Sequence, residues 1–183
     1  MQAAAYIRDA DLRFKSSKVR VVAHKNHPKI KLVGLTIGPL KEGESYELPL
    51  WVALELGRRG ITRVVDDCIL DPSKLHKIHW REKMQSPSSL SALPQDFYPK
   101  LRLLISELRA RADEGPEGAR EYVKVLNYSK DIVNCRVRKV VSMALARVEP
   151  TRALRNLTVE ERMLYEEVRR LVEEWRRRIL EVE

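Results

Sequence analysis

The spacing of apolar residues after Leu93 constrains the fold of this chain more than any other feature. In that region apolar side chains recur at steps of three and four, which places them on one face of an α-helix. Gly115-Pro116 and Pro150 divide the region into three helical stretches. Their apolar stripes are Phe97, Leu101, Leu104, Ile105 and Leu108 in the first, Tyr122, Leu126, Val133, Val137, Val140, Val141, Ala144 and Val148 in the second, and Leu164, Val168, Leu171, Trp175 and Ile179 in the third.

Two local signals refine this helical region. The apolar spacing lapses at Tyr128-Ser129, which allows a break in the second helix there. Thr158 and Glu161 have the spacing of a capping box, in which a hydroxyl and a carboxylate bind free amides at a helix start, so the last helix should begin at Thr158. We expect three or four antiparallel helices, packed through their stripes as a bundle domain over residues 93–183.

The first 70 residues have a different pattern. Short segments rich in β-branched residues alternate with glycines and turn residues, as in small β-rich domains. A helix over Leu50–Arg58 lies among them, with Pro49 in its first turn. The segments on either side of His24–Pro28 predict a hairpin or two neighbouring strands. The predicted strands are Val19–Ala23, Lys29–Val33, Tyr46–Leu48 and Ile61–Val65.

A further helix and a loop join these two regions. Asp71-Pro72 is a strong helix start, because the carboxylate caps free amides and proline has no amide to leave unpaired; the helix should reach about Met84. Ser86–Ser91 is the most loop-like segment, and we expect a flexible connection there. The predicted fold class is α+β: a small N-terminal β-rich domain over residues 1–70, a connecting helix and loop over residues 71–92, and a C-terminal α-helical bundle.

The sequence contains no recognisable catalytic arrangement. His76 and His79 are spaced to share a metal, but no third ligand stands near them, so ordinary histidines are the simpler interpretation. Asp66-Asp67 lacks the further oxygens that a hard cation needs, and the glycines do not form a phosphate-binding loop. We therefore predict that the chain is not an enzyme and binds no metal or cofactor.

Other sequence features indicate where in the cell the protein resides. Cys68 and Cys135 fall in different predicted domains and fit two reduced thiols. No segment approaches the length of apolar sequence that spans a membrane, and Arg8, Asp9 and Asp11 interrupt the start of the chain where a signal peptide needs an apolar run. We expect a cytoplasmic protein. The scarcity of Asn and Gln beside abundant Arg and Glu suggests the hypothesis of a thermophilic source.

The net charge of +9 permits contact with nucleic acid without demonstrating it. Two basic runs, Arg13–Lys31 and Asn134–Arg155, could neutralise phosphates, or could serve as solvated or protein-facing charge. Phe14 is the sole aromatic residue in them, whereas proteins that bind single strands usually stack bases on several. The candidate DNA contacts are Lys15, Lys18, Arg20 and Lys25.

A set of motifs resembles one family. Glu47–Leu56, followed by Arg58-Arg59, is similar to a signature of the GINS subunits whose small β domain precedes the helical domain. Further similar landmarks follow in the family's order, and Asp71–Met84 stands where the family has its connecting helix. The residues that carry the resemblance include Leu48, Pro49, Leu50, Trp51, Leu93, Pro94, Phe97, Tyr98, Asp131, Ile132, Arg136, Lys139, Asn156, Leu157 and Thr158.

This resemblance implies an archaeal scaffold subunit without catalytic activity. Such subunits form a tetramer through their helical domains, commonly two copies with two of a sister subunit of reversed domain order. The resemblance further implies association with the MCM helicase and a RecJ-like protein of the DHH family to support DNA unwinding in chromosomal replication, in a nucleoid-associated setting. Contacts with primase and polymerase are also described for the family. A free-standing basic DNA-binding protein is the alternative.

Surplus apolar surface on the helices agrees with assembly. Met163 and Tyr165 lie off the last stripe, and Val123 and Cys135 lie off the second, and such surplus usually marks association. Trp51 is expected in the core, where it would tie the short helix to the sheet. We expect Arg136 and Lys139 to form salt bridges across a subunit interface rather than to contact DNA. The candidate interface residues are Arg136, Lys139, Leu164, Val168 and Trp175.

Overall fold

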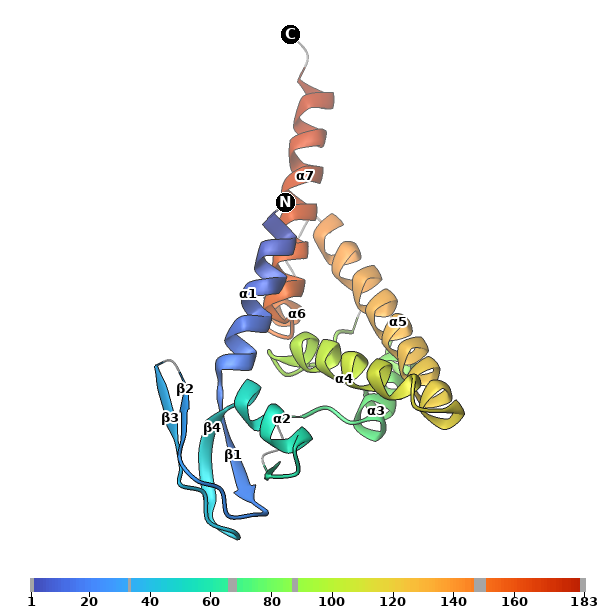
Figure 1. The fold of residues 1–183 in the computed structure, drawn as a ribbon. Helices are drawn as coiled ribbons and strands as arrows, with labels where there is room; N and C mark the ends of the chain where they lie inside the picture. The colour runs from blue at the N-terminus through green and yellow to red at the C-terminus, as the bar shows by residue number, and fades with distance from the viewer. Residues whose placement is uncertain (1, 33, 66–68, 87–88, 147–150, 182–183) are drawn as a thin grey trace. The chain divides into compact units, whose positions relative to one another are not determined.

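The computed structural model describes residues 2–32, 34–65, 69–86, 89–146 and 151–181 (Figure 1). The chain divides into two compact units, Ala4–Ile69 and Leu70–Glu183. A small N-terminal sheet region precedes a helical bundle, which confirms the predicted α+β class. The elements are α1 (Gln2–Ser16), β1 (Lys18–Ala23), β2 (Ile30–Leu32), β3 (Leu35–Ile37), β4 (Ser45–Pro49), α2 (Leu50–Arg58), β5 (Thr62–Val64), α3 (Pro72–Met84), α4 (Phe97–Ala112), α5 (Pro116–Leu145), α6 (Thr151–Leu154) and α7 (Val159–Leu180).

The small unit is built on a three-stranded antiparallel sheet in the order β4-β1-β5. β1 is central because it pairs with β4 on one side and β5 on the other. Its alternating residues Val19, Val21 and Ala23 are buried while Lys18 and Arg20 are exposed, so one face of the strand is covered. The predicted hairpin across His24–Pro28 is wrong, since β2 pairs with β3 instead. The pattern that identified β1 as a strand carries no information about its partners, which come from more distant sequence.

Two features of this unit differ from the sequence prediction. The α1 helix was not predicted, since its residues show no regular apolar stripe; an ion pair between Arg13 and Asp9, one turn apart, supports it. Trp51 is 47 % exposed and therefore not a core residue. The buried face of α2 consists of Leu50, Val52, Ala53 and Leu56, and Trp51 points away from that face.

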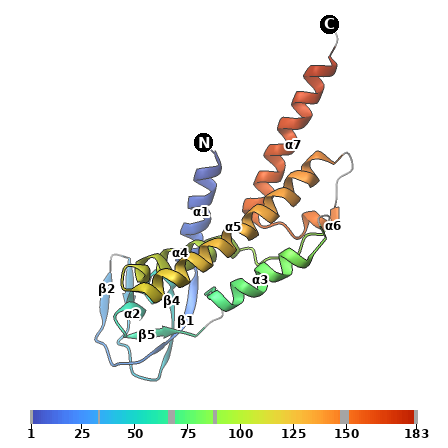
Figure 2. The ribbon, with the colours of Figure 1, turned by 90° about the vertical axis from the view of Figure 1, so that its right-hand side faces the viewer.

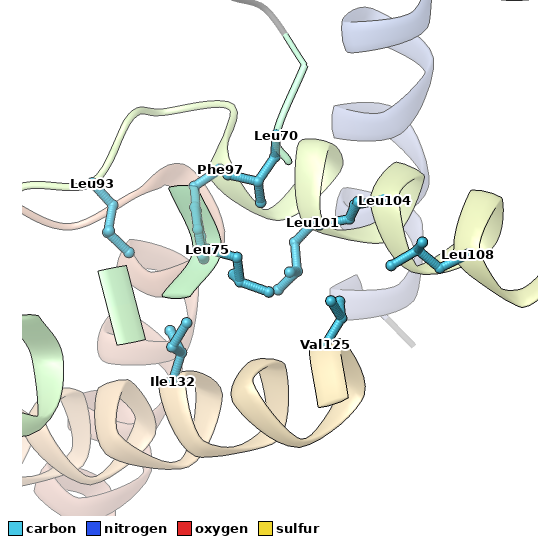
Figure 3. Packing of buried hydrophobic residues seen from close by; sticks show 9 residues of the cluster. All are labelled: Leu70, Leu75, Leu93, Phe97, Leu101, Leu104, Leu108, Val125 and Ile132. Carbon is cyan, nitrogen blue, oxygen red and sulfur yellow. The ribbon is translucent and has the colours of Figure 1, made fainter. Parts of the chain in front are cut away.

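The helical unit packs α3 and α4 against α5. Nine buried apolar residues form its main cluster, and the close-up shows side chains from α3, α4 and α5 meeting between the helices (Figure 3). Figure 2 shows α3 lying beside α5. The cluster consists of Leu70, Leu75, Leu93, Phe97, Leu101, Leu104, Leu108, Val125 and Ile132.

α5 is continuous through Tyr128-Ser129, so the break that the sequence allowed does not occur. The Ser129 hydroxyl is buried and donates to the Val125 carbonyl at 2.7 Å, which satisfies a polar group inside the apolar stripe. The Tyr128 ring stacks on His79 of α3, with 4.7 Å between centroids. The lapse in apolar spacing therefore marks a contact between helices.

The helices are not uniformly antiparallel, contrary to expectation. Contacts of His79 with Asp131 and of Glu82 with Lys139 show that α3 and α5 run in the same direction. The expected flexible connection over Ser86–Ser91 is also wrong at its end, because Leu90 and Ser91 are buried. Pro87 and Ser88 lie outside the described residues.

The close approach of α4 and α5 at Gly118 gives a testable prediction. A Cβ at this position would clash with the backbone carbonyl oxygen of Arg111, which cannot move aside as a side chain could. We expect Gly118→Ala to lower the free energy of unfolding by about 1–3 kcal/mol, as overpacking does. Urea denaturation measures this change. Gly115→Ala is the control, since nothing lies within 4 Å of a Cβ there; an equal loss in both variants would contradict the packing explanation.

Candidate assembly interface

The side chain of Arg136 on α5 is fully buried, and all five of its N–H donors are used. Its Nε and Nη2 each donate at 2.7 Å to one carboxylate oxygen of Glu161 on α7, which is the bidentate geometry that Arg favours. Nη1 donates to Glu82 of α3 at 3.1 Å and to the Ser91 carbonyl at 2.8 Å. Nη2 also donates to the Asn156 carbonyl at 3.2 Å.

Three further groups complete this buried network. Lys139 Nζ donates to the second oxygen of Glu82 at 3.0 Å, so two cations face two carboxylates and the charge balances. The Tyr98 hydroxyl of α4 donates to Glu161 at 2.7 Å. The Glu161 carboxylate also accepts the Thr158 backbone N–H at 3.0 Å, while the Thr158 hydroxyl accepts the Glu161 N–H. The capping box predicted from the sequence is therefore present and forms part of the network.

The network favours the charged form of Glu82 despite its burial. Burial raises the pKa of the Glu82 carboxyl, but hydrogen bonds from Ser91 and Lys139 and the charge of Arg136 outweigh it, so the pKa lies below its ordinary value. Burial lowers the pKa of Arg136, but the hydrogen bond and charge of Glu161 raise it above its ordinary value overall. Burial, followed by the charge of Glu161, raises the pKa of the Tyr98 hydroxyl.

A second apolar cluster fixes the N-terminal half of α7 to the end of α5. Its buried members include Val140 and Ala144 from α5 and Tyr165 from α7. Leu164 and Val168 pack against this cluster and are half-buried. Together with the bidentate pair between Arg136 and Glu161, the cluster sets the direction in which α7 leaves the bundle.

The same apolar stripe then continues along α7 without cover. Leu171, Trp175 and Ile179 follow Leu164 and Val168 on one face, but are between 62 % and 68 % exposed. Figure 1 and Figure 2 both show the C-terminal half of α7 extending past the end of α5. Large apolar side chains exposed in a continuous row usually mark an association surface. We call Leu171, Trp175 and Ile179 the α7 stripe.

The predicted interface residues separate into two groups. Leu164, Val168 and Trp175 lie along the line of the α7 stripe, with only Trp175 largely exposed. The prediction that Arg136 and Lys139 form salt bridges across a subunit interface is wrong, because both find their carboxylate partners within the chain. A signal for this was present, since Arg136 stands midway between Ile132 and Val140 on the buried stripe of α5.

Most of the motif residues have structural roles in this fold. Tyr98 and Thr158 belong to the buried network, and Asn156 donates from Nδ2 to the Leu90 carbonyl at 2.8 Å. Pro49 ends β4 immediately before α2, rather than standing inside its first turn. The remaining motif residues divide into the buried Leu48, Leu50, Leu93, Phe97, Ile132 and Leu157 and the exposed Trp51, Pro94 and Asp131.

The candidate DNA contacts lie on the surface of the small unit. Lys18 and Arg20 project from the same face of β1, opposite its buried valines, while Lys15 lies on α1 and Lys25 follows β1. All four side chains are exposed. The structure thus leaves them accessible, and whether they contact DNA stays a prediction.

The described residues hold no group of three or more His, Cys, Asp or Glu side chains that could bind a metal ion. His76 and His79 both lie against the Tyr128 ring, and His79 contacts Asp131 at 3.0 Å, so these histidines have packing roles. Asp66, Asp67 and Cys68 fall outside the described residues. None of the helices in the described part of the chain is long and apolar enough to cross a membrane.

Comparison with known proteins agrees with this two-part architecture. A family model described as the GINS complex protein helical bundle domain matches residues 69–180. The chain belongs to the GINS family. A second model, the PSF2 N-terminal domain, matches residues 11–65. Two relatives are the DNA replication complex GINS protein PSF2 of Homo sapiens, 27 % identical over 83 % of this chain and 80 % of its own length, and that of Xenopus laevis, 27 % identical over 80 % of this chain and 77 % of its own.

Membership in the GINS family identifies the chain as a subunit of a DNA replication complex. The matched helical bundle includes α3, α4, α5 and α7, and hence all four ionised groups of the buried network. The match also ends at residue 180, so it includes Leu171, Trp175 and Ile179. A GINS subunit has other GINS subunits as partners.

The buried network predicts a large stability effect at Arg136. Replacing Arg136 with Met removes a cation and leaves Glu161 buried without its bidentate partner. We expect a loss of about 3–5 kcal/mol in the free energy of unfolding. Arg136→Lys keeps the charge but cannot form the paired bonds, so its loss should also be substantial. Chemical denaturation measures both; Arg138→Met, at an exposed position two residues away, is the control, and equal losses at both sites would contradict the account.

Glu82 predicts a dependence of stability on pH. Its folded pKa lies below the ordinary value of 4.5, so its ionised form contributes stability above about pH 4.5, and this is lost as the pH falls through the folded pKa. We expect Glu82→Gln to be less stable at neutral pH and to lose less stability on acidification than the parent. Urea denaturation at several pH values tests this. Glu114→Gln, at an exposed position, should retain the parental dependence; a parental dependence in Glu82→Gln would refute the assignment.

Proposed function

We propose that this GINS chain is a non-catalytic scaffold subunit that assembles with a sister subunit through the α7 stripe. The observation that carries the proposal is the exposed apolar row on a helix whose first half is firmly anchored. Exposed Leu, Trp and Ile side chains in a row would release water on contact, and Trp is frequent among the residues that dominate binding energy. The anchoring network fixes where this row is presented.

The fuller form of the proposal follows the family resemblance. The sister subunit carries its domains in reverse order, two copies of each form a tetramer, and the source is archaeal. This tetramer joins the MCM helicase and a RecJ-like DHH-family protein, with primase or polymerase as further contacts. Its action is geometric: a scaffold that binds one arrangement of the helicase better than others shifts the helicase toward that arrangement.

Burial keeps the charged side chains of the network from contact with a substrate. The strongly interacting ionised groups Arg136, Glu82, Glu161 and Lys139 neutralise one another and are buried, so none is presented to a substrate. This supports a non-catalytic role. The alternative, a free-standing DNA-binding protein, is supported by the exposure of Lys15, Lys18, Arg20 and Lys25.

If the α7 stripe is the assembly surface, replacing its large side chains with alanine should weaken assembly. Co-expression of the chain with a GINS sister subunit should give a stable tetramer by size-exclusion chromatography with light scattering. The double variant Leu171→Ala with Trp175→Ala should weaken assembly about 30-fold or more, because a central Trp alone is often worth 2 kcal/mol or more. Both side chains are largely exposed, so the free chain should keep its fold, which circular dichroism checks.

Leu180→Ala is the matched control. Leu180 belongs to the same helix and is 77 % exposed, but its position lies away from the face of the α7 stripe. It should leave the tetramer intact. Two results would reject the proposal: a parent chain that remains monomeric beside its sister, or a double variant that assembles as well as the control.

A further inference from the structure

α3 has an outer face that the proposed assembly role does not use. Its inner side holds Leu75 and Glu82, both buried, whereas Trp80 and Met84 on the opposite side are 60 % and 64 % exposed. These two side chains stand four residues apart, so they lie one turn from each other along a single line. An indole this exposed has a face open to a ligand.

The charge of this outer face has one sign. Lys77, Arg81 and Lys83 are exposed, and none of the three forms an ion pair within the part of the chain that the structure describes. The single carboxylate in the α3 helix, Glu82, is buried against Arg136 and Lys139. Helical geometry places Lys77 and Arg81 on one side of the line through Trp80, and Lys83 on the other side. The indole therefore stands between cations with no competing carboxylate on its helix.

The surface is also hollowed beside this indole. A hollow of about 590 Å³ lies next to Trp80 and is lined by His76, Lys77, Ile78, Trp80 and Arg81. A flat aromatic group that entered the hollow would meet the indole and would remain within reach of the two cations. The hollow therefore combines a stacking surface with positive charge.

We propose that this outer face of α3, formed by Trp80, Met84, Lys77, Arg81 and Lys83, binds single-stranded nucleic acid. Phosphates would contact the three cations while one base stacks on the indole, and stacking on an aromatic side chain contributes about 1–3 kcal/mol per base. A duplex keeps its bases stacked inside, so it would gain the phosphate contacts alone. The site thus favours a single strand over a duplex.

The exposed indole favours nucleic acid over an acidic protein as the occupant. Phosphates and carboxylates can both pair with the three cations, but each nucleotide of a single strand also supplies a flat base that can stack on Trp80. Counterion release on phosphate binding supplies much of the affinity. The site shares no residue with the α7 stripe, since every residue in it belongs to α3.

The test uses the full chain and a fluorescein-labelled oligothymidylate of about 20 nucleotides, within the range that engages several phosphates. The chain has three tryptophans, so a Trp51→Phe, Trp175→Phe background leaves Trp80 as the sole indole. Addition of the unlabelled oligonucleotide should quench Trp80 fluorescence. In anisotropy titrations, Trp80→Ala should weaken binding about 10-fold or more, the equivalent of one stacked base.

Removal of charge gives a second readout. Lys77→Gln with Arg81→Gln should reduce the slope of log affinity against log salt by about 1.4, at roughly 0.7 for each phosphate contact to a single strand. Arg109→Gln with Arg111→Gln removes the same charge from exposed positions in the last turn of α4 and is the matched control. Equal effects of the two pairs would overturn the proposal, because they would show binding by overall charge.

Competition by three ligands distinguishes a single strand from the other possible occupants of the site. Unlabelled oligothymidylate should displace the probe, while a poly-glutamate peptide of equal charge and a duplex of equal length should compete weakly. Poly-glutamate that competes as well as the oligonucleotide, or a Trp80 signal that does not change on binding, would overturn the proposal in favour of an acidic protein partner. Circular dichroism confirms that the variants, all at exposed positions, remain folded.

Discussion

The bidentate contact between Arg136 and Glu161 is the interaction on which the helical unit depends. A guanidinium with five donors in the core is costly unless every donor is satisfied, and here α3, α7 and two connecting segments supply the acceptors. Because those acceptors come from distant parts of the chain, Arg136 is satisfied in one arrangement of the helices. The network is therefore a constraint on geometry as much as a source of stability.

The constraint set by Arg136 also fixes where the α7 stripe lies on the helical unit. The first half of α7 is held by its capping box, by Arg136 and by the cluster around Tyr165, whereas the second half continues with Leu171, Trp175 and Ile179 exposed. Helices without tertiary packing are marginal in water, so this second half would gain stability if a partner covers its apolar row, as we propose. The proposed assembly would thus bury apolar side chains that folding leaves exposed.

Features encoded in short stretches of sequence were predictable. The Asp71 cap, the Thr158–Glu161 capping box and the apolar line of α7 each depend on residues within a few turns of one another. Features that depend on distant partners were not. The alternation of β1 identified a strand but not its neighbours, and the exposure of Trp51 depends on which face of α2 meets the sheet.

Arg136 shows the difference most clearly. Its position between Ile132 and Val140 indicated a place on the buried stripe, yet its partners Glu82 and Glu161 stand 54 and 25 residues away in sequence. Sequence spacing alone did not pair them, so the charge was assigned to a subunit interface. A cation on an apolar stripe is better interpreted as a sign that neighbouring helices supply buried carboxylates.

Hydrogen–deuterium exchange, measured on the free chain and on its complex with a GINS sister subunit, tests the central claim most directly. The account predicts that backbone amides around Leu171, Trp175 and Ile179 exchange rapidly in the free chain and become protected in the complex. Amides near Arg136 should be protected in both states. Equal exchange along the second half of α7 in the two states, with protection gained elsewhere, would contradict the claim that this helix carries the assembly surface.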